Sequence, residues 1–201
     1  MRVFCNSKII SNSIFQLLNI FRFRLRIGRM DFKTVINNRK AVRRFIPNKR
    51  ISDQDIQTIL KTVNLAPSAG NMQSFRIFVV KSKKSIGKIF ETVNRKSSDF
   101  IPNAVAIFVF CADPEKSATR FGDRAHSLFA IQDATIAATY AILTATDLGY
   151  ATCWVGSFQE ELMKDAVDTN LTPVAAIVLG YPAESPTHPP RKEIHDIVKI
   201  L

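Results

Sequence analysis

The sequence predicts an α/β or α+β domain in which helices cover a central sheet of about four strands. Three observations predict this class. Helical and strand-like segments interleave along the chain. Its 201 residues suit one domain with a single substantial core. Hydrophobic residues make up 46% and charged residues 22% of the chain, which is ordinary globular usage and excludes general disorder.

The first half of the domain is predicted from apolar spacing and capping signals. Phe32, Val35 and Ile36 have helical spacing. Ser52 and Asp55 form an S-x-x-D capping box, so we expect a helix from there to the stop at Pro67. The expected elements are helices at residues 32–39, between Ser52 and Pro67, and at 85–93, and strands at 75–80 and 105–111.

The second half contains an Ala-rich helix that is apolar nearly all round. Such a helix must be covered on all sides, either in the centre of the domain or at a subunit interface. The tail from Tyr181 is rich in Pro and is expected to lie across another surface. The expected elements are a loop at residues 112–124, helices at 126–148 and 159–167, and strands at 151–155 and 173–179.

The positive charge of the chain is concentrated at its N-terminus. The formal net charge is +11, with 28 Lys and Arg against 17 Asp and Glu. Residues 1–29 carry +6 of this without a single acid, so the remainder carries only +5. A nucleic-acid or membrane-surface binding protein driven by this N-terminal cluster is therefore kept as an alternative function, although the body gives it little support.

Residues 1–29 leave several interpretations open. Polar residues interrupt the stretch too often for a membrane span, which needs roughly 20 apolar residues, and its basic residues follow the apolar part, unlike a secretory signal. An interfacial amphipathic anchor and an organelle presequence both favour basic, acid-poor segments. The interpretation we favour is a start at Met30 or a disordered extension, with residues 30–201 forming the domain and no stable membrane insertion.

Cysteine and histidine usage gives no sign of a disulfide scaffold or a metal site. Cys5, Cys111 and Cys153 are odd in number and lack CxxC spacing, which favours a reducing cytoplasm. The three histidines are far apart and lack ligand spacing. The chain also has no G-x-S-x-G, GxxxxGK[ST] or GxGxxG motif. Any chemistry is therefore expected to come from a cofactor.

Three segments are candidates for holding that cofactor. Residues 39–44 form a basic cluster at a helix-to-loop junction, and fixed cations are what a phosphate monoester needs; a solvated charged turn is the alternative. Residues 66–73 are rich in small residues and contain the amides of Asn71 and Gln73, which suit a heterocycle edge; a plain loop is the alternative. Residues 154–156 end a strand, where ligand sites of α/β proteins usually open.

Taken in order, these segments resemble the nitroreductase-like family of FMN-dependent NAD(P)H oxidoreductases, from about Phe32 to the C-terminus. RKAVRRF at residues 39–45 resembles the family's R-R-S-x-R-x-F, and APSAGNMQSF at 66–75 resembles A-P-S-x-x-N-x-Q-P-W. Gln132-Asp133 and the following Ala-rich helix, together with LGYATCWVG at 148–156, are similar to the family's central helix and G-L-G-x-x-x-x-W segment. Pro190-Arg191-Lys192 is similar to a further basic phosphate contact.

The resemblance implies a fold, an assembly and site residues. The fold would be a central mixed sheet flanked by helices, in an intertwined homodimer with FMN at the interface and the tail embracing the partner. Basic side chains would hold the phosphate, the 67–71 backbone and Asn71 would meet the flavin and ribityl chain, and the Gly156 N–H would face flavin N5 and O4. No side chain is assigned a certain catalytic role. The implied cofactor-binding residues are Arg39, Lys40, Ala41, Arg43, Pro67, Ser68, Ala69, Asn71, Gln73, Val155, Gly156 and Arg191.

The implied activity is transfer of electrons from NADH or NADPH through FMN to a nitroaromatic, quinone or similar small oxidised acceptor. Specialised flavin chemistry on the same fold, of the dehalogenase or cobamide-ligand type, is a further alternative. Two departures from the family pattern bear on acceptor preference. Ala41 replaces the usual serine, and Ser74-Phe75 replaces Pro-Trp.

Overall fold

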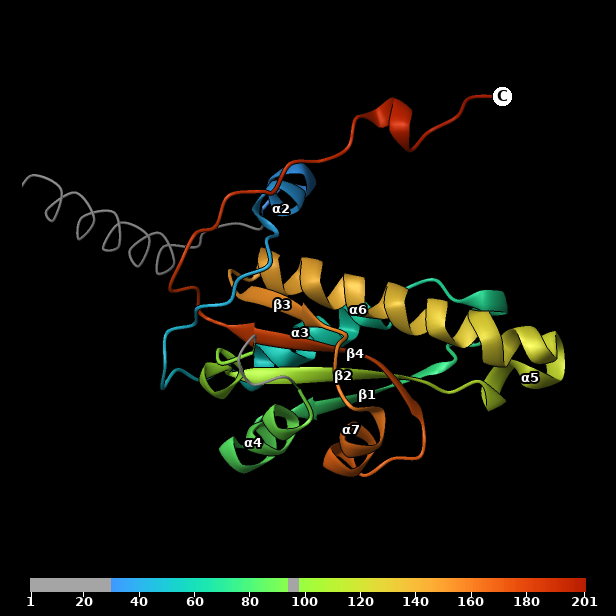
Figure 1. The fold of residues 1–201 in the computed structure, drawn as a ribbon, viewed down its shortest axis with the longest axis horizontal. Coiled ribbons are helices and arrows are strands. Elements are labelled where there is room, and N and C mark those ends of the chain that lie inside the picture. The colour runs from blue at the N-terminus through green and yellow to red at the C-terminus, as the bar shows by residue number, and fades with distance from the viewer. Residues whose placement is uncertain (1–29, 94–97) are drawn as a thin grey trace, which may run out of the picture.

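The computed structural model describes residues 30–93 and 98–201, and the basic extension therefore lies outside the described residues. A four-stranded sheet in the order β1-β2-β4-β3 separates two layers of helices. Helices α3 and α6 cover one face of the sheet, and α4 and α7 cover the other (Figure 1). This arrangement confirms the expected sheet with helices on both faces.

The strands fall where the sequence predicts them, to within one residue at each end. Each pair of neighbours is antiparallel. The parallel pairing that makes the sheet mixed is a single bridge between Ala41 and Thr152. The strands are β1 (Phe75–Val80), β2 (Ala106–Ala112), β3 (Ala151–Val155) and β4 (Thr172–Gly180).

The predicted helices are also present, and their caps follow the sequence signals. The Ser52 hydroxyl accepts a hydrogen bond from the Asp55 N–H at 3.0 Å, as the capping box predicts. The helices are α2 (Phe32–Asn38), α3 (Asp53–Val63), α4 (Lys83–Glu91), α6 (Ala130–Asp147) and α7 (Glu160–Val167), with short 3-10 turns at Ala69–Asn71, Ile101–Asn103 and Ile194–Asp196.

The prediction of a loop at residues 112–124 is wrong. The segment contains helix α5 (Glu115–Phe121), which follows Pro114 and ends at Gly122, a residue with φ of 54°. A π-helical turn (Ala125–Phe129) then leads directly into α6. A seven-residue helix is too short to be stable alone. Tertiary contacts supply the missing stability, because the Phe121 ring packs edge-on against Phe129 with 5.1 Å between centroids.

The core lies on both faces of the central strands, and every residue of β2 is buried. Helix α6 packs one side onto this sheet. The predicted cover on all its sides is not provided within the described chain, because a stripe of residues on its other side stays wholly or partly open. By length and composition Ala125–Asp147 could cross a membrane, but one side of it is packed on the sheet. The outer stripe of α6 is Ile131, Gln132, Thr135, Ile136, Thr139, Tyr140 and Leu143.

The C-terminal tail leaves the body after a short pairing with residues 44–46. The Ala183 N–H donates to Arg44 O at 2.9 Å, and further along His188 Nε2 lies 2.7 Å from Asn37 O of α2. The tail then extends away from the domain (Figure 1). It carries apolar side chains into solvent, namely Ile194, Ile197, Val198, Ile200 and Leu201.

Candidate functional site

The basic cluster lies along the outer edge of β3. The Val42 N–H donates to Thr152 O at 3.0 Å, which holds residues 39–45 beside this strand. Val42 and Phe45 are buried and anchor the segment, and the Phe45 ring packs directly on Gly180. The side chains of Arg43 and Arg44 between these two anchors are exposed, as is that of Ala41 before them. The segment therefore presents its cations along one edge of the sheet.

Arg43 joins this segment to β3 and to the tail. Its N–H donates to Glu184 Oε1 at 2.7 Å. Burial raises the pKa of the Cys153 thiol, and the Arg43 guanidinium beside this thiol partly offsets the effect. Arg39 and Lys40 form no ion pair with another described residue. These cations are therefore available to an anionic ligand.

The end of β3 exposes backbone. Val155 is buried, whereas Gly156 is exposed and lies beside the indole of Trp154. A Cβ at Gly156 would lie 3.3 Å from Trp154 Nε1, so a side chain there would be tightly placed. The missing side chain leaves the Gly156 backbone open to a flat ligand.

The loop at residues 67–73 has an unusual backbone that its own side chains support. Gly70, Asn71 and Gln73 all have positive φ, at 56°, 58° and 49°. The Ser68 hydroxyl accepts from the Gln73 N–H at 2.9 Å. Gln73 Nε2 donates to Asn71 O at 2.9 Å, so this amide braces the loop. The five loop residues assigned by resemblance are therefore brought together, with Pro67 at the loop's start.

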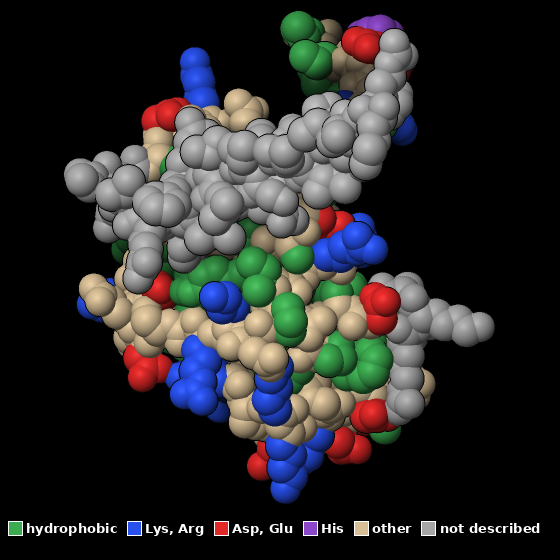
Figure 2. Space-filling view, turned by 90° about the vertical axis from the view of Figure 1, so that its left-hand side faces the viewer, with side chains coloured by type: hydrophobic (Ala, Val, Ile, Leu, Met, Phe, Trp, Pro, Cys, Tyr) green, Lys and Arg blue, Asp and Glu red, His purple; other side chains and the backbone are tan. Residues whose placement is uncertain are grey.

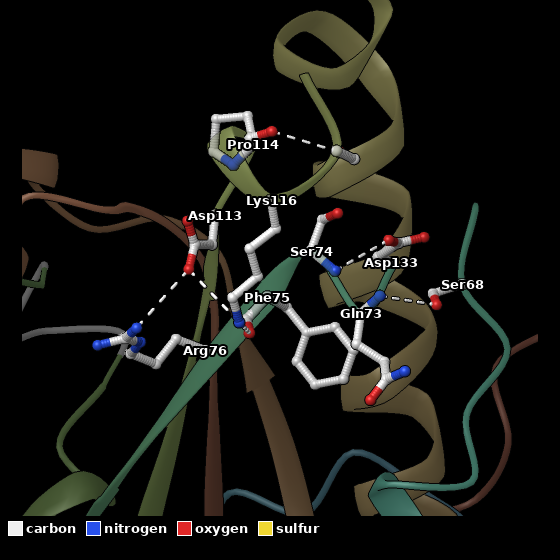
Figure 3. A network of polar contacts seen from close by, with 10 residues as sticks. Ser68, Gln73, Ser74, Phe75, Arg76, Asp113, Pro114, Lys116 and Asp133 are labelled. Carbon is white, nitrogen blue, oxygen red and sulfur yellow. Dashed lines mark hydrogen bonds and ion pairs between the residues drawn. The ribbon is translucent and has the colours of Figure 1, made fainter. Parts of the chain in front are cut away.

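Asp133 is a site residue to which the sequence assigned no role. Its side chain is buried in α6, and its two oxygens accept from the Ala69 N–H at 2.9 Å and the Ser74 N–H at 3.2 Å. Figure 3 shows the carboxylate of Asp133 beside the backbone at Ser74. An acid within an otherwise apolar Ala-rich helix was the signal that could have identified it.

A second buried acid holds the start of β1 from the other side. The Asp113 carboxylate lies 3.8 Å from Arg76 and 3.5 Å from Lys116, and Lys116 Nζ donates to Phe75 O at 3.3 Å (Figure 3). Ser74, one of the departures from the family pattern, is buried, and its hydroxyl has no hydrogen-bond partner within the described structure. The 67–73 loop therefore has a rigid base at both ends.

A single chain does not bring all the predicted site residues together. The 67–73 loop precedes β1, whereas the basic cluster and Gly156 lie along β3, and these two strands are opposite edges of the sheet. Because each pair of neighbouring strands is antiparallel, β1 begins at the end of the sheet where β3 ends. Three strand spacings, about 14 Å, separate them. Arg191 lies in the tail and is exposed.

Other candidate sites receive little support within the described residues. No group of His, Cys, Asp and Glu there is placed to hold a metal ion. A hollow of about 270 Å³ is lined by α2 residues Phe32, Lys33, Ile36 and Asn37, none of which is a predicted cofactor residue. Lys and Arg side chains on the face in Figure 2 are interspersed with acidic and uncharged ones, instead of forming one continuous positive patch.

Comparison with known proteins decides the family. The sequence model of the nitroreductase family matches residues 36–98 and 87–181, which include the basic cluster, the 67–73 loop and all four strands. The chain belongs to the nitroreductase family.

Individual relatives agree with this assignment. The chain is 33% identical over 156 residues to a protein of Archaeoglobus fulgidus assigned as an NADH dehydrogenase/NAD(P)H nitroreductase, a match that covers 75% of this chain and 84% of that protein. A nitroreductase family protein from Clostridium novyi is similar in structure, with TM-score 0.70, 32% identity and coverage of 80% and 89% of the two chains. A Staphylococcus epidermidis protein assigned as an NAD(P)H:FMN oxidoreductase has TM-score 0.76, 25% identity and coverage of 87% and 98%.

Proposed function

We propose that this nitroreductase-family enzyme is an FMN-dependent oxidoreductase that passes electrons from NADH or NADPH to a nitroaromatic, quinone or similar small oxidised acceptor. The observation that carries the proposal is the basic cluster on β3 followed, along the same strand, by the exposed backbone of Gly156. A phosphate site and a flat backbone platform on one strand suit a flavin mononucleotide, which has an anionic end and a planar end.

The residues present fit FMN. Arg39, Lys40 and Arg43 would hold the phosphate, together with Arg191 of the tail, because guanidinium groups match a phosphate dianion in charge and geometry. Ala41 at the usual serine position removes one hydroxyl from this set. Val155 and Gly156 would approach the flavin through their backbone.

The 67–73 loop would contact the ring and ribityl chain. Pro67, Ser68 and Ala69 would do so through backbone, and Asn71 through its amide. Gln73 already braces Asn71. We therefore assign Gln73 to support of the loop, with any flavin contact secondary.

In the proposed reaction, the protein would bind the cofactor and orient the substrates against it. FMN, held by these residues, would supply two-electron redox chemistry between NAD(P)H and the acceptor. The Gly156 N–H would donate a hydrogen bond where negative charge develops. No protein side chain is required as a strong acid or base, so protons for the acceptor would come from solvent.

Two features support a homodimer with FMN at the interface. The predicted site residues beside β1 and β3 of one chain lie at opposite edges of the sheet, and a second chain would bring the 67–73 loop of one protomer to the basic cluster and Gly156 of the other. The outer stripe of α6 also has the chemistry of a buried face. Thr135 and Thr139 donate their hydroxyls to carbonyls one turn back, at 2.8 and 3.0 Å, and therefore present methyl groups outward.

Two further parts of the proposal concern the extent of the domain and its cellular compartment. We propose that residues 30–201 act as the FMN-binding domain. Cys111 and Cys153 are free and buried, which suits a reducing cytoplasm.

The function is tested first by the visible spectrum of the purified protein and by release and identification of any chromophore. We expect FMN at about one per chain, and FMN-dependent oxidation of NADH or NADPH when an acceptor such as menadione is added. Arg43→Gln should weaken FMN binding, whereas Lys84→Gln, which removes one exposed charge from α4, should not. A colourless protein that fails to take up added FMN, or a loaded one that oxidises neither nicotinamide, would overturn the proposal.

A further inference from the structure

The C-terminal end of α5 places an arginine directly on the 67–73 loop. Arg120 Nη1 donates to Gly70 O at 3.3 Å. A Cβ at Gly70 would lie only 2.7 Å from Arg120 Nη1 and 3.0 Å from the Phe121 ring. The guanidinium and the ring therefore both rest on Gly70, one residue before Asn71.

A second arginine is held in the same way by the following π-helical turn. The Arg124 guanidinium carbon lies 5.1 Å from the centroid of the Phe129 ring, and that of Arg120 lies 5.3 Å from the centroid of Phe121. The two rings form the edge-on pair that closes the corner between α5 and α6. Two exposed guanidinium groups are thus fixed on one aromatic pair.

The nearby acids do not neutralise these arginines. The Asp123 carboxylate forms no ion pair with a described residue, and Glu115 lies 3.7 Å from His126. A guanidinium has five N–H donors, and the one hydrogen bond that the described structure gives Arg120 uses the Gly70 carbonyl. The hydrogen bond to the loop therefore uses only part of the hydrogen-bonding capacity of Arg120.

We propose that Arg120, assisted by Arg124, binds an oxyanion carried by one of the two substrates that visit the flavin. This inference rests on the proposed function and adds the substrate's charge to it. The oxyanion is either a carboxylate on a planar acceptor or the 2′-phosphate of NADPH. A planar acceptor would contact the partly exposed Phe121 ring, and a fixed guanidinium fork favours a bidentate oxyanion.

The test uses the FMN-loaded full chain and two nitroaromatic acceptors, the anion 4-nitrobenzoate and its uncharged methyl ester, methyl 4-nitrobenzoate. NADH and NADPH are compared in parallel. Arg120→Gln is expected to lower kcat/KM about tenfold or more for the anionic member of one pair, through KM, because a hydrogen bond to a charged group is lost. The kcat/KM for the neutral acceptor, or for NADH, should change less than twofold. In the wild-type enzyme, the advantage that Arg120 gives to the anionic substrate should decrease as the salt concentration rises.

The two pairs distinguish the source of the oxyanion, and Lys84→Gln serves as the control for net charge. A loss of kcat/KM confined to 4-nitrobenzoate identifies the acceptor as the carrier of the oxyanion. A loss confined to NADPH identifies the electron donor as its carrier. Both outcomes support the proposal. Because Arg120 also donates to Gly70 O, the rates are compared at saturating FMN. Equal losses of kcat/KM for charged and neutral substrates, or no loss for either anion, overturn the proposal. Activity of wild-type enzyme with the neutral acceptor and NADH tests the proposed function separately, because neither carries the oxyanion.

Discussion

At the scale of single residues, Asp133 governs the conformation of the 67–73 loop. A buried carboxylate is costly unless its oxygens are hydrogen-bonded. Here both oxygens accept backbone N–H groups, on either side of the three left-handed residues. The charge therefore stays inside the domain, and the loop is held in a conformation that it would not favour alone.

Asparagine at this position keeps the shape but replaces one acceptor oxygen with a donor. We expect Asp133→Asn to lower the free energy of unfolding by about 1.5–3 kcal/mol, because a hydrogen bond to a charged group is lost and two donors face each other. Asp165→Asn, at an exposed site on α7, should change it by less than about 0.5 kcal/mol. Urea unfolding of both variants measures this. Equal free energies of unfolding for Asp133→Asn and the wild type would show that the carboxylate contributes no more to stability than an amide does.

The same substitution separates loop support from general stability. FMN titrations at a temperature where the variant is fully folded should give a dissociation constant at least several-fold above that of the wild type, since the loop would lose its template. An unchanged dissociation constant would mean that Asp133 acts on stability alone.

At the scale of elements, local signals predicted most of the fold. The Ser52 capping box, the apolar spacing of α3 and the β-branched runs of β1 and β2 are all local in sequence, and the structure agrees with them. Helix α5 was missed because its stability comes from Phe121 on Phe129, a contact that no periodicity encodes. The motifs propose the segments of the candidate site, but the contact of Asp133 with the 67–73 loop joins residues 64 positions apart, which no local pattern indicates.

The docking of the basic cluster onto the sheet depends on a glycine at the end of β4. The Phe45 ring occupies the space where a Gly180 side chain would be, because a Cβ there would lie 2.3 Å from Cγ of the ring. Gly180→Ala should therefore displace the ring and lower the free energy of unfolding by about 1–3 kcal/mol. Thermal or urea unfolding measures the change.

Gly87 of α4 provides a matched control. Nothing lies within 4 Å of a Cβ built there. Because alanine favours helix more than glycine does, Gly87→Ala should raise the free energy of unfolding by about 0.5–1 kcal/mol. If Gly180→Ala were as stable as Gly87→Ala, the close packing of Phe45 on β4 would be refuted.

At the scale of the whole molecule, strand order divides the site between two edges. No local pattern predicts that β1 and β3 become the outer strands, because the order β1-β2-β4-β3 depends on which distant segments pair. The motifs therefore name candidate cofactor-binding residues, whereas the separation of these residues within one chain is seen only in the strand order. The open stripe on α6 and the extended tail are what such a divided site requires, since both offer apolar surface to a second chain.

If FMN lies at the proposed dimer interface, this division predicts that assembly and cofactor binding are interdependent. Removing residues 186–201 keeps Glu184 and its bond to Arg43 but deletes Arg191 and the exposed apolar side chains of the tail. We expect the full chain to sediment as a dimer, and the shortened chain to dissociate at protein concentrations at least tenfold higher and to bind FMN more weakly. Arg191→Gln in the full chain separates the two effects, because it should weaken FMN binding while the dimer persists. A shortened chain that stays dimeric and retains full FMN affinity would instead place the interface on α6 alone and exclude the tail from the site.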